Sequence, residues 1–300
     1  MFGKNKAMKK LSVVPFWKYH KCRIRLKKGT GDMVYSTLTR KNVCGQITEE
    51  FYVDEAYDTV GKEAFKNSIK VRRVYLSNIR KIETEAFWGC TSLLTVDMPK
   101  TSRIGKGAFA GCSNLRSAVF PEVFSLLGKG VFLKCKRLGK AIFQNNRNCK
   151  KIPSQSFAEC RQLKVLQLPN QLVSIEEQAF YKCEALEKII LPDSLKVVES
   201  KAFYQCGLKE IELPDGLEKI GDSAFLKCKK LKYVRIPSSV REIGKWAFHG
   251  CGELECLEIT HDPEVIGEWI TNKNCTIRCR KGSKAEAYAE KYGMKIILLP

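Results

Sequence analysis

Apolar residues recur along most of this chain in one pattern that is repeated end to end. The clearest copy, from Ser174 to Lys196, has the form I-x-x-x-A-F-x-x-C-x-x-L-x-x-I-x-L-P and is followed by a polar turn. Successive copies place a phenylalanine 22 to 25 residues after the previous one. A fixed period in this range is typical of a solenoid, in which each repeat forms one coil. The nine phenylalanines are Phe65, Phe87, Phe109, Phe132, Phe157, Phe180, Phe203, Phe225 and Phe248.

The end of each repeat, L-x-x-I-x-L-P, predicts a short strand. In one copy Ile189 and Leu191 stand two residues apart, so both side chains point to the same side of a strand. Pro192 cannot donate a ladder hydrogen bond, and it therefore ends the strand. The segment I-x-x-x-A-F-x-x-C-x-x-L has apolar residues three to five positions apart, which favours a short helix or 3₁₀ turn.

A single coil of this kind cannot bury its apolar side, but stacked coils can. The strands of neighbouring coils then pair in parallel. The sequence therefore predicts an α/β solenoid with a parallel sheet on its concave face and short helical or 3₁₀ turns on the opposite face.

These repeats resemble the BspA-like class of leucine-rich repeat, which carries the same A-F, Cys and L-P signatures. The resemblance covers the chain from about Thr59 to its C-terminus, and eight of the nine copies carry the cysteine. It implies a non-catalytic binding scaffold of a kind often found on bacterial or protist cell surfaces. It names no partner, because the repeated residues build the core.

The repeat divides the chain into three predicted parts. Residues 1–58 lack the repeat and form a basic N-terminal segment, in which two predicted strands between Lys21 and Leu38 indicate a β-hairpin cap. Residues 59–260 form nine coils. Residues 261–300 form a C-terminal cap, with a helix that Ser283 begins and Gly293 ends, and with a last strand near Leu299.

The formal charge of +21 is unevenly distributed. Residues 1–45 hold twelve Lys and Arg against one acid, and residues 124–151 hold eight against none. The second group spans the fourth coil and its two-residue insertion. These residues are either a solvated surface or a contact for anionic polymers such as nucleic acid, acidic polysaccharide or an anionic membrane. The candidate basic patch is Lys134, Lys136, Arg137, Arg147, Lys150 and Lys151.

Eight of the fourteen cysteines take the same position in successive coils. This uniform position predicts a buried ladder of free thiols, with disulfides between coils or metal sites as alternatives. The N-terminus shows only a short apolar stretch, Leu11 to Trp17, so we expect no signal peptide, and no run reaches the roughly 18 residues of a membrane span. These features favour the cytoplasm, although related proteins are often secreted. The repeat cysteines are Cys90, Cys112, Cys135, Cys160, Cys183, Cys206, Cys228 and Cys251.

Residues on either side of the central apolar residue of each strand point away from the core and form a ribbon along the stacked coils. Apolar members such as Val165 indicate either a surface that binds a partner or only the preference of β-branched residues for strands. The leading hypothesis is a protein ligand bound on this ribbon, and the alternative is electrostatic binding of a polyanion. The candidate ribbon residues are Tyr75, Val119, Lys140, Ile142, Val165, Gln167, Lys188, Ile190, Tyr233 and Arg235.

Candidate catalytic chemistry is sparse. None of the three histidines stands in a pattern that indicates a nucleophilic triad, and no phosphate-binding G-x-x-x-x-G-K-[ST] loop occurs. Cys256, His261, Cys275 and Cys279 lack the C-x-x-C spacing of structural zinc sites. We therefore expect no enzyme activity, no metal and no cofactor.

Overall fold

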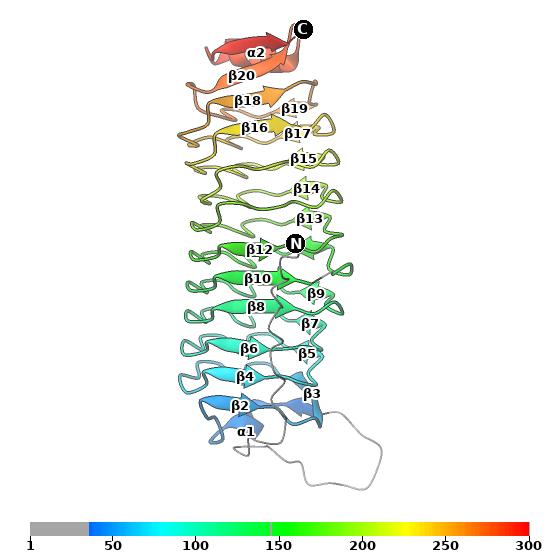
Figure 1. Cartoon of the computed structure of the whole chain (residues 1–300), viewed down its shortest axis with the longest axis vertical. Helices are drawn as coiled ribbons and strands as arrows, with labels where there is room; N and C mark the ends of the chain where they lie inside the picture. The colour runs from blue at the N-terminus through cyan, green and yellow to red at the C-terminus, as the bar shows by residue number, and fades with distance from the viewer. Residues whose placement is uncertain (1–35, 145, 300) are drawn as a thin grey trace, which may run out of the picture.

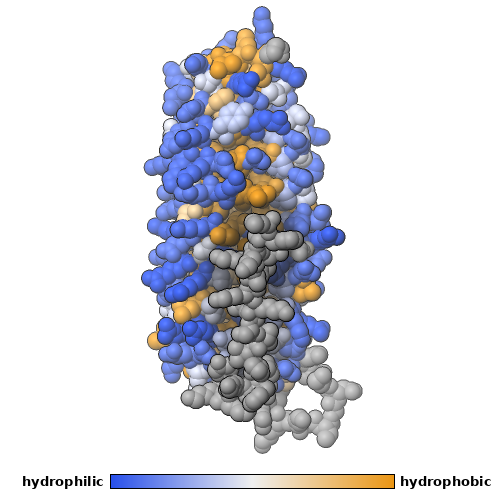
Figure 2. Space-filling view, viewed as in Figure 1, coloured by the Kyte–Doolittle hydropathy of each residue, from blue (hydrophilic) through white to orange (hydrophobic). Residues whose placement is uncertain are grey.

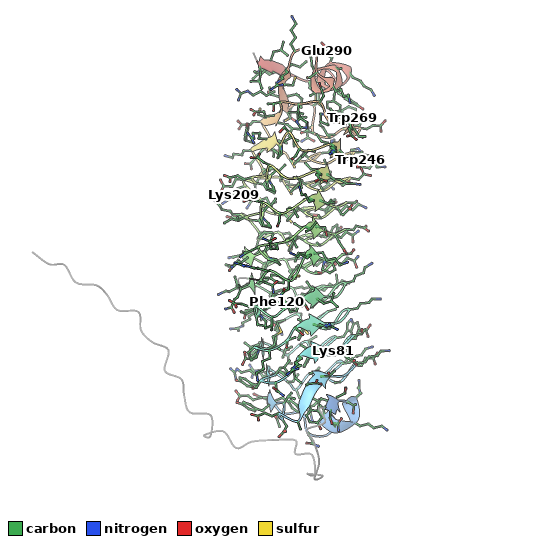
Figure 3. The ribbon with its side chains drawn as sticks, turned by 90° about the vertical axis from the view of Figure 1, so that its right-hand side faces the viewer. Lys81, Phe120, Lys209, Trp246, Trp269 and Glu290 are labelled. Atoms are coloured by element: carbon green, nitrogen blue, oxygen red, sulfur yellow. The ribbon has the colours of Figure 1, made fainter. Side chains whose placement is uncertain are left out.

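The coils stack in chain order along a single column. The computed structural model describes residues 36–144 and 146–299. The column is nearly straight in two perpendicular views, and neither view shows the curvature expected to make the sheet face concave (Figures 1 and 3). Parallel strands lie on two faces of the column, which we call the ribbon face and the second face.

The ribbon face carries strands at seven of the nine L-x-x-I-x-L-P segments, whereas residues 188–191 and 210–213 form none. The face holds three parallel sheets, ordered β2-β4-β6, β8-β10-β12 and β16-β18-β20-β21. The strands of this face are β2 (Glu50–Tyr52), β4 (Arg73–Tyr75), β6 (Thr95–Asp97), β8 (Ser117–Phe120), β10 (Lys140–Phe143), β12 (Val165–Gln167), β16 (Tyr233–Ile236), β18 (Cys256–Ile259), β20 (Thr276–Arg280) and β21 (Ile296–Leu299).

The second face carries mostly two-residue strands in sheets of five and six members. These eleven strands mark about eleven coils in the described residues, two more than the nine predicted from the phenylalanines. They are β1 (Ser36–Leu38), β3 (Tyr57–Val60), β5 (Lys81–Ile82), β7 (Arg103–Ile104), β9 (Leu126–Leu127), β11 (Lys151–Ile152), β13 (Ser174–Ile175), β14 (Val197–Val198), β15 (Lys219–Ile220), β17 (Glu242–Ile243) and β19 (Val265–Ile266).

The A-F segments form tight turns, not the helical or 3₁₀ turns that their spacing predicted. In one coil Gln178 and Lys182 both have positive φ, 58° and 57°, and pairs four residues apart recur in most other coils. A right-handed helix requires negative φ throughout, so these residues prevent one. The amide of Phe180 bonds to the carbonyl of Ala202 in the next coil at 2.8 Å, outside any helical pattern. Alternate amides such as those of Gln178 and Lys182 bond to the next coil in the same way, whereas the amide of Tyr181 bonds within the turn, to the carbonyl of Gln178.

The nine predicted phenylalanines form one continuous file of stacked rings. Neighbouring ring centroids lie 4.7 to 5.5 Å apart, and the ring planes are within 13° of parallel. All nine rings are buried. The file confirms that the phenylalanine of each repeat takes the same position in its coil.

The eight repeat cysteines form the predicted buried ladder of free thiols. Each Sγ lies 3.0 to 3.3 Å from the carbonyl oxygen of a phenylalanine in the preceding coil, as Cys90 does from Phe65. The thiol can donate a hydrogen bond to that carbonyl. Burial raises the pKa of most of these thiols, for example that of Cys183.

The ends of the chain match the sequence predictions in part. The predicted hairpin cap falls mostly on residues outside those described; within its second strand, β1 pairs in parallel with β3. The short helix α1 (Arg40–Val43) and strand β2 also precede residue 59. At the other end, α2 (Lys284–Lys291) begins after Ser283, whose side chain accepts a bond from the amide of Glu286. The boundaries at residues 58 and 260 remain predictions.

Candidate interaction surface

Strand pairing sets the outward residues of the central sheet, β8-β10-β12, in two columns. The first column contains Ser117, Lys140 and Val165, and the second contains Val119, Ile142 and Gln167. Val165 therefore lies beside Lys140, out of line with Val119 and Ile142. The apolar strip expected on the ribbon bends from one column to the other.

Several apolar side chains on this face are open to solvent. Exposure is 39% for Val119, 50% for Val165, 78% for Ile190 and 46% for Tyr233, whereas Ile142 is half-buried. The intervening strand residues, such as Ala141, are buried, as side-chain alternation requires. In the upper half of the view, hydrophobic residues gather along the middle of the column, with hydrophilic residues on both sides (Figure 2).

The ribbon segments of two coils, residues 188–191 and 210–213, lie between β12 and β16 without strand pairing. The second of these coils has one residue fewer between its cysteine and leucine, because Gly207 alone separates Cys206 from Leu208. A Cβ at Gly207 would lie 2.2 Å from the carbonyl oxygen of Glu184. Ile190 therefore belongs to an irregular part of the ribbon face.

In the coils that follow β12, the two cations predicted for the ribbon, Lys188 and Arg235, are both paired with acids. Lys188 Nζ lies 2.6 Å from a carboxylate oxygen of Glu210, and this hydrogen bond raises the pKa of Lys188. Arg235 lies 2.9 Å from Asp215. The hydroxyl of Tyr233 donates to Glu258 at 2.9 Å. These side chains already have partners within the chain.

The central sheet is different, because its cations have no ion pair within the described residues. Lys140 projects from β10, and other cations stand immediately before the neighbouring strands or at the corner leading into β10. All of them are exposed. This group, which we call the central cations, consists of Arg116, Lys136, Arg137, Lys140 and Lys164.

The six residues of the predicted basic patch do not share one surface. Lys134, Lys136 and Arg137 precede β10, whereas Arg147 and Lys150 follow it. Four residues of strand, roughly 13 Å, separate the two groups. Lys151 lies in β11 on the second face and pairs with Glu176 at 3.0 Å.

The two-residue insertion after β10 is held by a buried asparagine. The amide nitrogen of Asn146 donates to the carbonyl of Phe124 at 2.6 Å, and its oxygen accepts from the amides of Asn148 and Cys149. Asn146 is fully buried. The side chain of Asn146 therefore fixes the shape of the insertion. The polar sequence alone did not show whether this segment was a structural turn or a binding loop.

Sequence reasoning missed members of the ribbon face. Tyr52 in β2 stacks on Tyr75 in β4 with centroids 4.4 Å apart, so one side of the predicted Tyr75 ring is covered. The alternation in E-F-Y-V, which precedes the matching R-V-Y-L by 23 residues, was the available signal. Arg116 and Lys164 were missed because they lie one position before the strands.

Other candidate chemistry is not assembled by the fold. In the described ranges, no group of three or more His, Cys, Asp or Glu is placed to hold a metal ion. Nε2 of His261 contacts the backbone carbonyl of Val240 at 2.7 Å. Across residues 36–144 and 146–299, the helices are too short or too polar to cross a bilayer.

Comparison with solved structures identifies the same fold. A leucine-rich repeat protein from Bacteroides ovatus superposes with a TM-score of 0.64 at 22% identity, covering 82% of this chain and 66% of its own. The pneumococcal vaccine antigen PcpA gives 0.44 at 17% identity over 86% and 90%. The leucine-rich repeat protein of T. pallidum gives 0.35 at 22% over 80% and 89%. The chain thus spans about two thirds of the length of the Bacteroides protein.

Comparison with sequence families is more decisive. None of the curated protein sequences matches the chain significantly. The model for the BspA type leucine rich repeat region matches residues 42–164 and 150–278 in six copies. These matches cover most of the chain and carry the repeat spacing described above. The chain therefore belongs to the family of BspA-type leucine-rich repeat proteins.

Proposed function

We propose that this chain is a non-catalytic scaffold that binds a protein ligand through its ribbon face. The observation that carries the proposal is the central sheet, where Val119, Ile142 and Val165 are at least partly exposed in fixed register beside Lys140. Solenoids recognise partners through extended surfaces of this kind. Exposed apolar side chains that stand together favour a protein contact over open solvent.

The ten candidate ribbon residues contribute unequally in this proposal. Val165 and Lys140 are central. Val165 is an exposed apolar side chain, and Lys140 is exposed and has no ion pair in the described residues. Lys188 and Arg235 are secondary, since breaking their ion pairs offsets part of any new contact. Tyr75 offers only one ring face.

Replacing Val165 with glutamate tests the proposal. The substituted side chain remains on an exposed position, so we expect little change in thermal stability but clear loss of partner capture from a native cell extract. Val173→Glu is the matched control: Val173 is 40% exposed and lies directly before β13 on the second face of the same coil. Equal capture by both variants and the wild-type chain would contradict the proposal.

A second candidate function is electrostatic binding of a polyanion. Residues 98–158 hold twelve Lys and Arg and a single acid, Glu122, which gives a net charge of +11. Such a region attracts nucleic acid or acidic polysaccharide, with affinity that falls steeply as salt rises. Measuring retention on heparin across salt concentrations tests it, and elution well below physiological salt would reduce it to a nonspecific charge effect.

A further inference from the structure

We infer that the ligand segment seated on β8, β10 and β12 is an acidic amphipathic helix that lies along the column. This inference rests on the proposed function and specifies its partner. Three properties of the central sheet lead to it: uncompensated positive charge, exposed apolar side chains without aromatic ones, and the spacing between coils.

The first property is a change in charge pairing along one face. On β2 and β4, Arg73 pairs with Glu50 at 2.7 Å. Above β12, Glu187 accepts from both Lys209 and Lys230, at 2.7 and 3.4 Å. Between these sections the five central cations have no ion pair in the described residues. The same repeat positions carry acids elsewhere, so the fold itself does not require this gap.

Lys229 and Lys232 also lack an ion pair in the described residues, but the acids Glu253 and Glu255 lie in the next coil, where their amides donate to the backbone carbonyls of these two lysines. Four of the five central cations instead lie in a section, residues 98–158, that holds twelve Lys and Arg and a single acid, and such a section is where an external acid would fit. Such charge complementarity raises the rate of association and selects the partner. Asp97 is the single acid among the outward strand residues of β6, β8, β10 and β12, and burial raises the pKa of its carboxyl. The central sheet is therefore complementary to an acidic ligand.

The second property distinguishes a polypeptide from a nucleic acid. Single-stranded nucleic acids bind by stacking bases on exposed aromatic rings beside basic residues. In the central sheet the aromatic residues Phe120 and Phe143 are buried, and the outward side chains are aliphatic or polar. Val119 and Val165 match the apolar side of a polypeptide.

The third property favours a helix over an extended segment. Strand neighbours lie about 4.8 Å apart, so β8 to β12 spans about 9.6 Å. Helical residues i, i+3 and i+7 rise by about 4.5 and 10.5 Å, close to these steps. Alternate residues of an extended chain advance by about 6.7 and 13.4 Å and lose register by the second step. β10 is also paired on both sides, which leaves no edge there for an added strand.

A titration of the full-length chain with a designed probe tests the inference. The probe is a fluorescent helical peptide of about 20 residues with Leu at i, i+3, i+7 and i+10 and Glu on one flank. A scrambled peptide of equal composition and a single-stranded oligonucleotide are the comparison probes. Fluorescence anisotropy gives each dissociation constant at low and physiological salt.

Matched charge variants locate the site. Lys136→Glu with Lys164→Glu changes the central cations, and Lys229→Glu with Lys232→Glu makes the same change at equivalent repeat positions three to four coils away. All four lysines are exposed and without an ion pair in the described ranges. We expect the helical peptide to bind the central variant about tenfold or more weakly, and the control variant as tightly as the wild type.

The outcomes separate this inference from the proposed function. Equal affinity for helical and scrambled peptides, or tighter binding of the oligonucleotide, would overturn the acidic helix. If Val165→Glu abolishes native capture while the central charge variant retains it, the ribbon face binds a protein but the acidic partner is wrong. If neither variant changes native capture, the proposed function itself fails.

Discussion

At the scale of single residues, the interior contains two parallel files, one of phenylalanine rings and one of cysteine thiols. Rings such as Phe157 and Phe180 stack 5.5 Å apart and are fully excluded from water. Stacked aromatic pairs contribute about 0.5–1.5 kcal/mol beyond their buried area. Each interior ring contacts a ring on both sides, so one substitution disturbs two neighbours.

We expect Phe180→Ala to lower the free energy of unfolding by about 3–5 kcal/mol, because it opens a cavity in the file and removes two stacking contacts. Ile190→Ala is the control, since Ile190 is 78% exposed and should change stability by less than about 0.5 kcal/mol. Urea unfolding followed by circular dichroism measures both. Similar midpoints for the two variants would contradict a continuous ring file.

We expect the buried thiol of Cys149 to make the folded chain less stable at alkaline pH. Burial raises the pKa of its thiol from 9.0 to about 11, so the folded state holds the proton more tightly than the unfolded state. Its contribution is complete below pH 9 and is lost as pH rises toward 11, on the order of 2 kcal/mol. Cys149→Ala should therefore lose less stability than the wild type between these values in denaturant titrations. Parallel pH curves would show that Cys149 titrates freely when folded.

At the scale of elements, most strands of the ribbon face could be predicted from sequence, but the short strands of the second face and the turns could not. The alternation in Tyr233–Ile236, ended by Pro237, predicts β16 from local rules alone, whereas the same pattern at Ile189 and Pro192 forms no paired strand. Residues 176–183 have helix-like apolar spacing, yet Gln178 and Lys182 adopt left-handed backbone conformations. The signal in this coil was weak, because Gln and Lys are not turn-specific, although glycines such as Gly107 and Gly111 take the same positions with positive φ in another coil. Half of the backbone bonds of these turns come from the next coil, as from Phe180 to Ala202, and a single repeat does not contain that partner.

Lys201→Gly should raise the free energy of unfolding by about 0.5–1 kcal/mol. Lys201 has φ of 56°, where glycine is unstrained and a side chain is disfavoured. Lys164→Gly is the matched exposed control at a position without positive φ, and it should lower stability by a similar amount. Opposite signs in thermal unfolding are expected; destabilisation by both would argue for a right-handed helical turn.

Asn146→Ala should destabilise the chain by about 2 kcal/mol or more, because it leaves the carbonyl of Phe124 and the amide of Cys149 without their side-chain partner. Asn148→Ala, at an exposed neighbour in the same loop, should have little effect. Chemical denaturation compares them. A small effect at Asn146 would mean that the insertion holds its shape without this anchor.

At the scale of the whole molecule, the repeat period was enough to predict the column and its outward ribbon. It was not enough to identify the candidate surface, because ion pairs join residues about one coil apart, such as Lys188 and Glu210. A count of charges in the fourth coil grouped Lys136 with Lys151, which lie on different faces. Only the three-dimensional register separates the paired cations from the central cations.

A ligand that covers the central sheet of the ribbon face should shield the lysines of that sheet from chemical modification. Acetylation of lysines in the full-length chain, with and without its captured ligand and read by mass spectrometry, tests this directly. We predict that Lys140 and Lys164 become protected in the complex, while Lys229 and Lys232 react as they do in the free chain. Protection of Lys229 and Lys232 with full reactivity at Lys140 and Lys164 would contradict a ligand on the central sheet.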